Sequence, residues 1–394
     1  MKKSQVKSPL IMHVRATNFF GGPEKQIFEH ISRSRNYQHA VVTFIDGPTK
    51  NELSEKCIEA NIPVYSLTAR NAFDPLMVVK LRSAIVSLAP SLICSHGYRP
   101  TILLTLATIG MKIPIIGFAR GFTAENPKVA FFEFWERRAL AGMFGIICVC
   151  QAQKQQLERM GVHAKKWWTV HNAVAVHEGT PDPLVAEQIR KSLGILEDGA
   201  LIVCAGRLSP EKGQKDLLQA ISMIRGSDRK ACFVICGDGP CRESLEQEAV
   251  SLGISDRVRF AGFRRDLLEI FSIMDLLVLP SYTEGLPNVI LEAFSCAKPV
   301  VATKVGGVPE IVENGRNGFL IPPGRPNLLA QAIESCLDSA DLMESMGRSG
   351  RNLVISKFSF EEQTRKIESI YKEILFCQRN DAFDPANNRS ESRQ

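Results

Sequence analysis

The chain has 394 residues, of which 45% are hydrophobic and 23% are charged. This length and composition are typical of a soluble globular protein with two domains. No apolar run reaches the roughly 18 residues that a membrane-spanning helix needs. The first apolar segment is short and lacks a small-residue cleavage site, so we interpret it as a strand rather than a signal peptide.

The net charge of +6 is unevenly distributed along the chain. Residues 1–180 carry 22 lysines and arginines against 12 acids, which gives +10, and the remainder carries 26 against 30, which gives −4. A basic first half suggests an anionic partner, such as a phospholipid surface or a phosphorylated acceptor. Nucleic acid is disfavoured as a partner, because no basic run is interleaved with aromatic residues and no nucleic-acid motif is present.

The chain contains 11 cysteines, and most lie in apolar runs such as GIICVC and LIVCAG. No pair has zinc-like spacing with partnering histidines, and Cys148 and Cys150 form only a C-x-C within an expected strand. We therefore expect reduced thiols in the core of a cytoplasmic protein.

Short apolar runs alternate with segments of helical period along the whole chain. In the first half we expect strands over residues 10–14, 39–44, 62–67, 91–96, 113–118, 145–150 and 167–172. In the second half we expect strands over residues 201–206, 232–237, 258–262, 275–280, 299–303 and 318–323. Amphipathic segments such as Glu24–Ser34, Pro75–Leu88 and Pro127–Ala141 lie between them. Apolar strands that are each followed by a helix predict parallel sheets covered on both faces.

A polar stretch, AVHEGTPDPLVAE, separates the two series of strands. We place the domain boundary there and expect a first domain over residues 1–178 and a second over residues 179–360. Residues 381–394 lack apolar periodicity, which predicts a disordered tail. Two doubly wound domains in tandem would place the carboxyl ends of their strands at a shared cleft, where ligands of such sheets bind.

The segment LIVCAGRLSPEKGQKDLLQAI predicts a strand, a loop with Arg207, Lys212 and Gly213, and then a helix. A lysine at a helix amino terminus is unfavourable, because the helix macrodipole attracts anions there. The conflict disappears when an anion lies between them, since free backbone N–H groups and two cations then converge on it. A solvated basic turn is the alternative interpretation of this segment alone.

The segment EGLPNVILE, residues 284–292, has a glutamate at each end. Pro287 is a typical first residue of a helix, which leaves Glu284 in the preceding loop. The backbone N–H groups in the stretch Leu286 to Val289, of which Pro287 has none, are then free to bind phosphate oxygens. Glu292 can accept hydrogen bonds from a ribose, and Glu284 can hold sugar hydroxyls. Two solvated glutamates are the alternative interpretation of the spacing alone.

These two segments occur in a fixed order with several others. The order runs FFGGPEKQI, SLICSHGYRP, IICVCQAQKQQL, VHNAV, GRLSPEKG, ICGDGP, VRFAGFRRDL, PSYTEGLPNVILEAFSCAKPVVAT and GGVPEIVENGRNGFLIPP. Over about residues 9–377 the chain resembles the family-four retaining glycosyltransferases, the group 1 glycosyl transferases. The resemblance implies an α/β protein of the GT-B fold, with two Rossmann-like doubly wound parallel-sheet domains facing a central cleft. It also implies that residues 361–378 form a helix that crosses back to the first domain.

The resemblance implies roles for individual residues. Arg207 and Lys212 would bind the donor diphosphate, Glu284 would bind the transferred sugar, and Glu292 would bind the ribose. His96 matches the histidine beside the reacting carbon, although a lone histidine at a strand end is often structural. These assignments make His96, Glu284, Arg207 and Lys212 the expected catalytic residues.

The resemblance also extends the donor-binding set beyond these residues. The glycines of the first loop would allow the backbone to approach the diphosphate closely. The segment after VRFAG would flank the nucleobase through its backbone. The amides just before and at the start of the helix that follows Glu284 would assist in binding the donor. The further residues in this set are Gly21, Gly22, Phe263, Arg264, Gly285, Leu286, Pro287, Asn288 and Val289.

The function implied is transfer of a hexosyl unit, with retention of configuration, from a nucleotide-diphosphate sugar. A UDP-sugar is favoured as donor, GDP-mannose comes next, and the nucleotide sugar is a co-substrate rather than a cofactor. We expect no metal, because the sequence has no Asp-x-Asp cluster. The basic first domain favours a cell-envelope glycan acceptor (lipopolysaccharide, exopolysaccharide or glycolipid), free or lipid-linked. It also favours peripheral association with an anionic inner membrane surface.

Three other classes of protein compete with this interpretation. A nucleotide-sugar epimerase on the same fold would need extra acid/base carboxylates, and a non-catalytic nucleotide-binding regulatory protein would not need Glu284, Lys212 and His96 together. A dinucleotide dehydrogenase is disfavoured because no G-x-G-x-x-G follows the first strand.

The aromatic segment PKVAFFEFWERRAL has two competing interpretations. It is either a core helix with a basic outer edge or an interfacial patch for a lipid-bearing acceptor.

Overall fold

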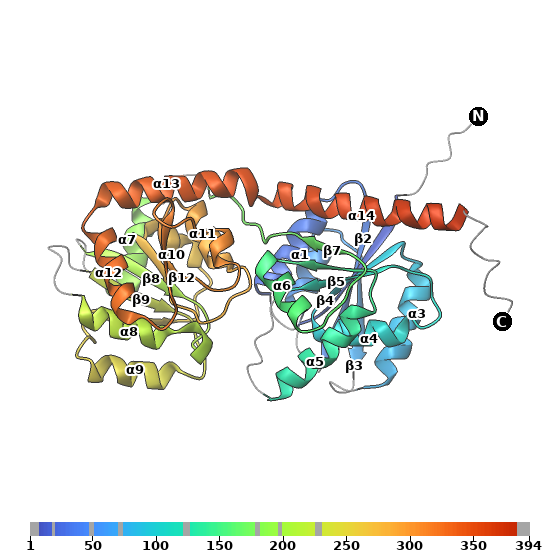
Figure 1. Cartoon of the computed structure of the whole chain (residues 1–394), viewed down its shortest axis with the longest axis horizontal. Coiled ribbons are helices and arrows are strands. Elements are labelled where there is room, and N and C mark those ends of the chain that lie inside the picture. The colour runs from blue at the N-terminus through green and yellow to red at the C-terminus, as the bar shows by residue number, and fades with distance from the viewer. Residues whose placement is uncertain are drawn as a thin grey trace. The chain divides into compact units, whose positions relative to one another are not determined.

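The structure is a computed structural model. It describes residues 8–17, 20–46, 51–69, 74–120, 127–177, 182–195, 199–224 and 231–383. The chain divides into two compact units (Figure 1), of which the first ends at His171 and resumes at Phe360, and the second covers Asn172–Ser359. The sequence-based boundary at residue 178 lies a few residues later. Each unit is an α/β domain built on one parallel sheet, which confirms the expected fold class.

The first unit contains a seven-stranded sheet of order β3-β2-β1-β4-β5-β6-β7, in which every pair is parallel. Its strands are β1 (Leu10–Ala16), β2 (Gln38–Asp46), β3 (Val64–Ala69), β4 (Leu92–His96), β5 (Ile115–Ala119), β6 (Gly145–Cys148) and β7 (Trp167–Thr169). Its helices are α1 (Gly22–Arg33), α2 (Glu52–Glu59), α3 (Leu76–Leu88), α4 (Tyr98–Ala107), α5 (Pro127–Ala141), α6 (Gln151–Arg159) and α14 (Phe360–Phe383). Each of the seven expected strands is present.

The second unit contains a six-stranded parallel sheet of order β10-β9-β8-β11-β12-β13. Its strands are β8 (Ala200–Ala205), β9 (Ala231–Cys236), β10 (Val258–Gly262), β11 (Leu276–Leu279), β12 (Val300–Thr303) and β13 (Gly318–Ile321). Its helices are α7 (Pro183–Ser192), α8 (Gln214–Met223), α9 (Arg242–Ser251), α10 (Leu267–Ile273), α11 (Asn288–Ser295), α12 (Pro326–Leu337) and α13 (Ala340–Lys357), with 3-10 turns at Pro210–Lys212 and Val308–Glu310. All six expected strands are present here too.

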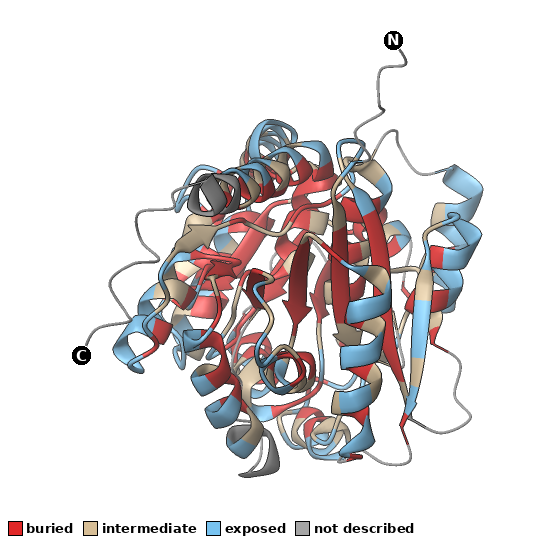
Figure 2. Cartoon of the chain, turned by 90° about the vertical axis from the view of Figure 1, so that its right-hand side faces the viewer, coloured by how far each residue is buried: buried red, intermediate tan, exposed pale blue. Residues whose placement is uncertain are grey.

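The central strands are apolar because both of their faces are covered. β4, β5, β8 and β11 are buried along their full length, and Figure 2 shows buried strands beneath helices whose outer faces are exposed. In the first unit, one side of the sheet packs on the carboxyl-terminal helix, because Ile367, Ile370, Tyr371 and Ile374 of α14 share a cluster with Ile11. Helix α14 thus belongs to the core of the first unit.

Helix α14 is longer than the sequence analysis expected. It begins at Phe360 rather than residue 361 and continues to Phe383, so residues 381–383 of the expected tail are helical. Residues 384–394, the rest of that expected tail, lie outside the described residues.

The strand order places a switch point in each sheet. The order reverses between β1 and β4 in the first unit and between β8 and β11 in the second. Ligands of open parallel sheets bind beyond the carboxyl ends of the two strands that flank such a point. Two loops of the second unit therefore matter most: residues 206–213, after β8, and residues 280–287, after β11.

Candidate functional site

The two loops at the switch point of the second unit touch each other closely. Gly213 has a φ of +66°, and a Cβ at this position would lie 2.2 Å from the carbonyl oxygen of Pro280. Only glycine adopts this conformation readily and allows such an approach. The contact holds the end of the first loop, which carries Lys212, against the start of the second loop, which carries Glu284.

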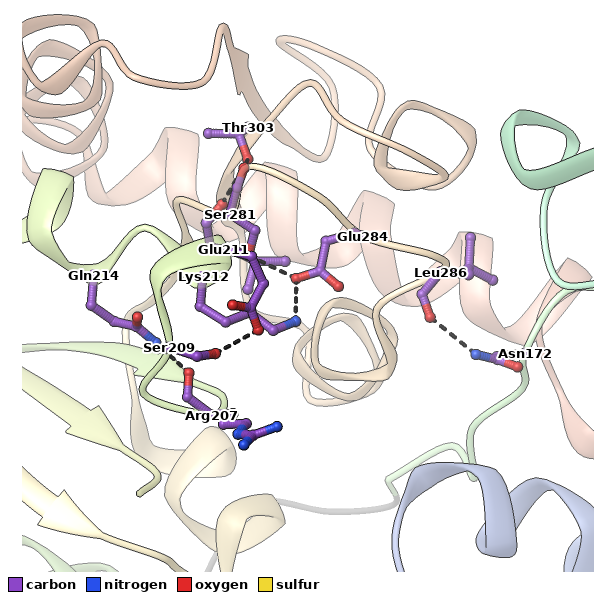
Figure 3. Close-up of polar contacts among 11 residues, drawn as sticks. Asn172, Arg207, Ser209, Glu211, Lys212, Gln214, Ser281, Glu284, Leu286 and Thr303 are labelled. Atoms are coloured by element: carbon purple, nitrogen blue, oxygen red, sulfur yellow. Dashed lines mark hydrogen bonds and ion pairs between the residues drawn. The ribbon is translucent and has the colours of Figure 1, made fainter. Parts of the chain in front are cut away.

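The central interaction of the site is an ion pair between these two side chains (Figure 3). Lys212 Nζ donates to Glu284 Oε1 at 2.8 Å, and Ser281 Oγ donates to the same oxygen at 2.7 Å. The Lys212 side chain is 26% exposed and that of Glu284 is 8% exposed. A lysine with three donors keeps two for another acceptor when one is used here. The pair therefore presents a cation that is held in position and still able to bind an anion.

The backbone of Glu284 is held by a third loop, the one after β12. Gly306 has a φ of +50°, and a Cβ there would lie 1.8 Å from the carbonyl oxygen of Glu284. The amide of Gly307 donates to the carbonyl oxygen of Gly285 at 2.8 Å. Thr303 Oγ1 donates to the carbonyl oxygen of Ser281 at 2.5 Å. The backbone of the loop that carries Glu284 is thus held at Ser281 by the Thr303 side chain and at Gly285 by the amide of Gly307.

Helix α11 begins one residue later than the sequence predicts. Pro287 is the N-cap residue, with extended backbone, and Asn288 is the first helical residue. Glu284 still lies in the preceding loop, as the proline led us to expect. Leu286 is buried, and its carbonyl oxygen accepts a hydrogen bond from Asn172 Nδ2 at 3.0 Å (Figure 3).

The other expected donor-binding residues of the second unit are spread over three elements. The carbonyl oxygen of Arg207 accepts from Gln214 Nε2 at 2.8 Å. Glu292 is half-buried in the second turn of α11. Phe263, after β10, is 73% exposed. Arg264 donates to both carboxylate oxygens of Asp266, at 2.8 and 2.5 Å, and these bonds raise the pKa of Arg264. The structure thus pairs Lys212 directly with Glu284, and it places the Arg264 guanidinium in an ion pair with Asp266.

His96 lies at the carboxyl end of β4, at the switch point of the first sheet, but its ring is buried. The side chain is 2% exposed, and its Nε2 is 3.1 Å from Nδ1 of His13. Its ring centroid is 4.5 Å from that of Phe118. Burial and the charges of Arg120 and Arg15 lower the pKa of His96 well below its ordinary value. The ring of His96 is therefore buried in this structure, and its catalytic role stays a prediction.

The glycine loop of the first unit is organised by a glutamate. The amide of Gly21 donates to Glu24 Oε2 at 3.0 Å, which caps α1, and Arg15 Nε donates to Glu24 Oε1 at 2.8 Å. Gly21 has a φ of −111°, which other residues can also adopt. Glycine therefore matters at this position because it has no side chain, and not because of its backbone conformation. Gly22 is the first residue of α1.

A charged cluster around this loop was missed by the sequence reasoning. Arg15 Nη1 donates to the carbonyl oxygen of His96 at 3.1 Å. Arg120 follows β5, and desolvation with the charge of Arg15 lowers its pKa to about 10. Glu136 of α5 is buried, and burial with the charge of Glu133 raises its pKa to about 8. Arg15 and Arg120 each stand at the carboxyl end of a central strand, which is the sequence signal that identifies them.

Helix α5 presents most of its aromatic side chains to solvent. Phe131, Phe134 and Trp135 are 58%, 42% and 48% exposed, whereas Phe132 stacks on Tyr98. The expectation of an aromatic core helix is therefore wrong for three of the four residues. Among the described residues, no helix is long and apolar enough to cross a membrane.

Solved structures share this architecture. The crystal structure of HepE from Anabaena in complex with UDP-glucose superposes with a TM-score of 0.81, covering 93% of this chain and 100% of that chain at 23% identity. The two parallel-sheet units therefore define a protein of the GT-B fold. Residues 185–353 match the family of glycosyl transferases group 1, and residues 20–178 match glycosyltransferase family 4. These two matches together cover most of the chain, which belongs to the group 1, family-four glycosyltransferases.

Curated relatives agree with this family. Alpha-D-kanosaminyltransferase of Streptomyces kanamyceticus is 35% identical over 189 residues, which is 48% of this chain and 49% of that protein. The chain thus spans about half the length of that relative. The GDP-mannose-dependent alpha-(1-6)-phosphatidylinositol monomannoside mannosyltransferase of Mycobacterium tuberculosis is 26% identical over 359 residues, covering 86% of this chain and 84% of that protein.

Proposed function

We propose that this protein transfers a hexosyl unit from a nucleotide-diphosphate sugar to a cell-envelope glycan, with retention of configuration. A UDP-sugar is the favoured donor, and GDP-mannose is the next candidate. The observation that carries the proposal is the Lys212–Glu284 pair, at 2.8 Å, beside the amino terminus of α11 at the switch point of the second sheet. The HepE structure in complex with UDP-glucose and the GDP-mannose-dependent mycobacterial relative support the choice of donors.

The leaving group in this proposal is a nucleoside diphosphate. Negative charge grows on its phosphate oxygens as the bond to the sugar carbon breaks. Lys212, Arg207 and the free amides at the start of α11 stabilise that charge, which is the strongest form of catalysis available to a preorganised site. No divalent ion is required in this proposal, because the two cations supply the charge.

Glu284 has two tasks in this proposal. Its Oε1 accepts from both Lys212 and Ser281 and so fixes the lysine, and its Oε2 faces the sugar hydroxyls. The acceptor oxygen forms its bond to the anomeric carbon on the face from which the phosphate leaves, and the acceptor proton passes to the departing phosphate oxygen. Such a front-face displacement needs no protein nucleophile on the opposite face.

A panel of nucleotide sugars tests the proposal. The parent protein should release nucleoside diphosphate from one donor, faster when the acceptor is present, and Glu284→Gln should abolish most of this release. Glu344→Gln is the matched control, because Glu344 is 66% exposed and pairs with Arg348 at the surface of α13. Conversion of the donor sugar without release would identify an epimerase, and tight nucleotide binding without either reaction would identify a regulatory protein.

A second proposal concerns where the acceptor meets the protein. We infer that α5 contacts an anionic membrane surface, because its exposed aromatic residues lie beside two arginines. The guanidinium carbon of Arg138 is 5.1 Å from the centroid of the Phe134 ring, and that of Arg137 is 6.0 Å from it. Aromatic rings suit the headgroup region, and each basic residue near an anionic surface adds about 1 kcal/mol.

A further inference from the structure

Four histidines lie together in the core of the first unit. His13 of β1, His30 of α1, His39 of β2 and His96 of β4 are all buried, between 1% and 7% exposed. Nε2 of His13 is 3.1 Å from Nδ1 of His39, and Nδ1 of His13 is 3.1 Å from Nε2 of His96. The ring centroid of His30 is 6.0 Å from that of His13 and 5.6 Å from that of His39. The chain contains seven histidines, so this gathering needs an explanation.

Hydrogen bonds among the rings do not explain the cluster fully. Within the described part of the chain, Nε2 of His39 and Nδ1 of His96 are buried without a hydrogen-bond partner. Each neutral imidazole has one N–H group and one bare nitrogen, so the row His39–His13–His96 leaves one unsatisfied atom at each end in either tautomeric state. An unsatisfied buried polar atom costs about 1–3 kcal/mol, so the hydrogen bonds within the row do not by themselves account for the burial of these rings.

The spacing of three of the rings suits a metal ion. One ring nitrogen from each of His13, His30 and His39 lies within 4.8 Å of the other two. Nitrogens bound at about 2.0–2.1 Å in tetrahedral geometry are about 3.3 Å apart. The His13–His39 pair already has nearly this separation, at 3.1 Å. The third ring needs a shift of at most about 1.5 Å, the difference between these separations.

The surroundings of the rings match those of histidine ligands. A metal-bound imidazole usually donates its other N–H group to a neighbour that fixes its orientation. Nδ1 of His13 faces His96 in this way. Both ring nitrogens of His30 face hydroxyls from α14, with Nε2 3.1 Å from Tyr371 and Nδ1 3.4 Å from Thr364. Metal binding by His30 therefore replaces one of these two contacts, and the other orients the ring. The ligand form is neutral imidazole, and burial favours that form throughout the cluster.

We propose that His13, His30 and His39 bind one divalent transition-metal ion of the zinc class. His96 orients His13, and one of the two α14 hydroxyls, of Tyr371 or of Thr364, orients His30. Three imidazoles select zinc, copper or nickel over magnesium and calcium, which prefer oxygen ligands. The ion joins β1, β2 and α1 to each other and, through His30, to α14. Its role in this proposal is structural.

Metal binding to the full chain, produced without a histidine tag and stripped with a chelator, tests this proposal. Equilibrium dialysis against Zn²⁺ should give one ion per chain, and bound Zn²⁺ should raise the temperature of thermal unfolding. His39→Gln should weaken binding at least about 100-fold, because it removes a direct ligand rather than an outer-shell group. His163→Gln, at an exposed position outside the cluster, is the matched control and should bind like the parent.

Two results overturn the proposal: a stripped parent that takes up no zinc at micromolar concentration, and equal binding by the parent and a folded His39→Gln variant. Circular dichroism shows whether the variant folds. If it does not, X-ray absorption of the zinc-loaded parent decides alone. Three imidazole ligands support the site, whereas sulfur ligands or fewer than two imidazoles place the ion elsewhere.

Discussion

Lys212 and Glu284 are 72 residues apart in the sequence, and their charged atoms lie 2.8 Å apart. The contact depends on Gly213, which lets the two loops approach, and on Ser281, which holds the same carboxylate oxygen. An ion pair with a largely buried partner differs from a surface pair, because loss of the cation leaves a carboxylate uncompensated. The pair therefore links the stability of the donor loops to their proposed chemistry.

Lys212→Ala should reduce turnover by about 30- to 1000-fold, which corresponds to the 2–4 kcal/mol typical of one lost oxyanion donor. It should also lower the free energy of unfolding by about 1–3 kcal/mol, because Glu284 loses its charged partner. Lys215→Ala is the control, since the Lys215 side chain on α8 is 63% exposed and its Nζ lies 3.6 Å from Glu248 Oε1 on α9. Steady-state kinetics and denaturant unfolding measure the two effects, and unchanged turnover would contradict the phosphate role.

Glu292→Ala should weaken binding of the nucleoside diphosphate about 10- to 100-fold, the effect of removing a charged hydrogen-bond partner. The anomeric configuration of the product should not change, because the residue is assigned to the ribose rather than to the reacting sugar. Titration calorimetry with free nucleotide measures the first effect, and Glu344→Ala on α13 is the control. Equal affinity in the variant and the parent would remove the ribose assignment.

Gly306→Ala should disturb the Glu284 loop through its backbone. The new Cβ would meet the carbonyl oxygen of Glu284 at 1.8 Å, and the φ of +50° is already unfavourable for alanine. Gly315→Ala separates the cost of the left-handed backbone from the cost of the steric clash. Gly315 has a φ of +77°, but nothing lies within 4 Å of its Cβ position.

The control should cost about 1–2 kcal/mol of unfolding free energy from the left-handed backbone alone. Gly306→Ala should cost more and should reduce turnover, whereas Gly315→Ala should leave turnover unchanged. Thermal unfolding and initial rates measure both. Equal destabilisation with full activity in both variants would show that the loop tolerates the displacement.

All thirteen strands and the parallel architecture could be predicted from the sequence, because a strand covered on both faces must be apolar along its length. The loop position of Glu284 followed from Pro287 for a similarly local reason. Its pairing with Lys212 could not be predicted, because it depends on the neighbouring positions of β8 and β11 in the sheet. Strand neighbours at a switch point are not consecutive in the chain.

The burial of His96 could not be predicted from the sequence for the same reason. The sequence places a histidine at the end of a strand, but only the fold brings His13 beside it. For helix α5 the core interpretation was wrong, because Phe131, Phe134 and Trp135 are exposed to solvent rather than buried. Aromatic residues alone do not say which face of a helix is covered.

Replacing Arg137 and Arg138 with glutamate should reduce co-sedimentation with anionic vesicles. Attraction between the basic helix and such a surface is screened within about 10 Å at 0.1 M salt, so binding by the parent should also fall as salt rises. Arg316→Glu with Arg348→Glu is the control, because both arginines are about two-thirds exposed on the second unit and the change in charge is the same. Equal sedimentation with neutral and anionic vesicles would favour a soluble acceptor.

Glu136 should make the stability of the protein depend on pH between its unfolded and folded pKa values. Burial and Glu133 raise its pKa to about 8, against the opposing charges of Arg15 and Arg137. In this range the folded state keeps a proton that the unfolded state has lost, so stability falls as pH rises and levels off above about pH 8. A single group contributes at most about 1.4 kcal/mol per pH unit.

Glu136→Gln removes the titratable carboxyl group from both the folded and the unfolded state, and it keeps a neutral side chain of similar shape. Relative to the parent, the variant should therefore gain stability progressively from about pH 6.5 to pH 8, the upper part of the window set by the raised pKa. Denaturant unfolding at several pH values measures the difference, and Glu158→Gln, a half-exposed glutamate of α6, is the control. Parallel pH profiles for the variant and the parent would show that Glu136 is ionised in the folded protein and that Arg15 outweighs the cost of burial.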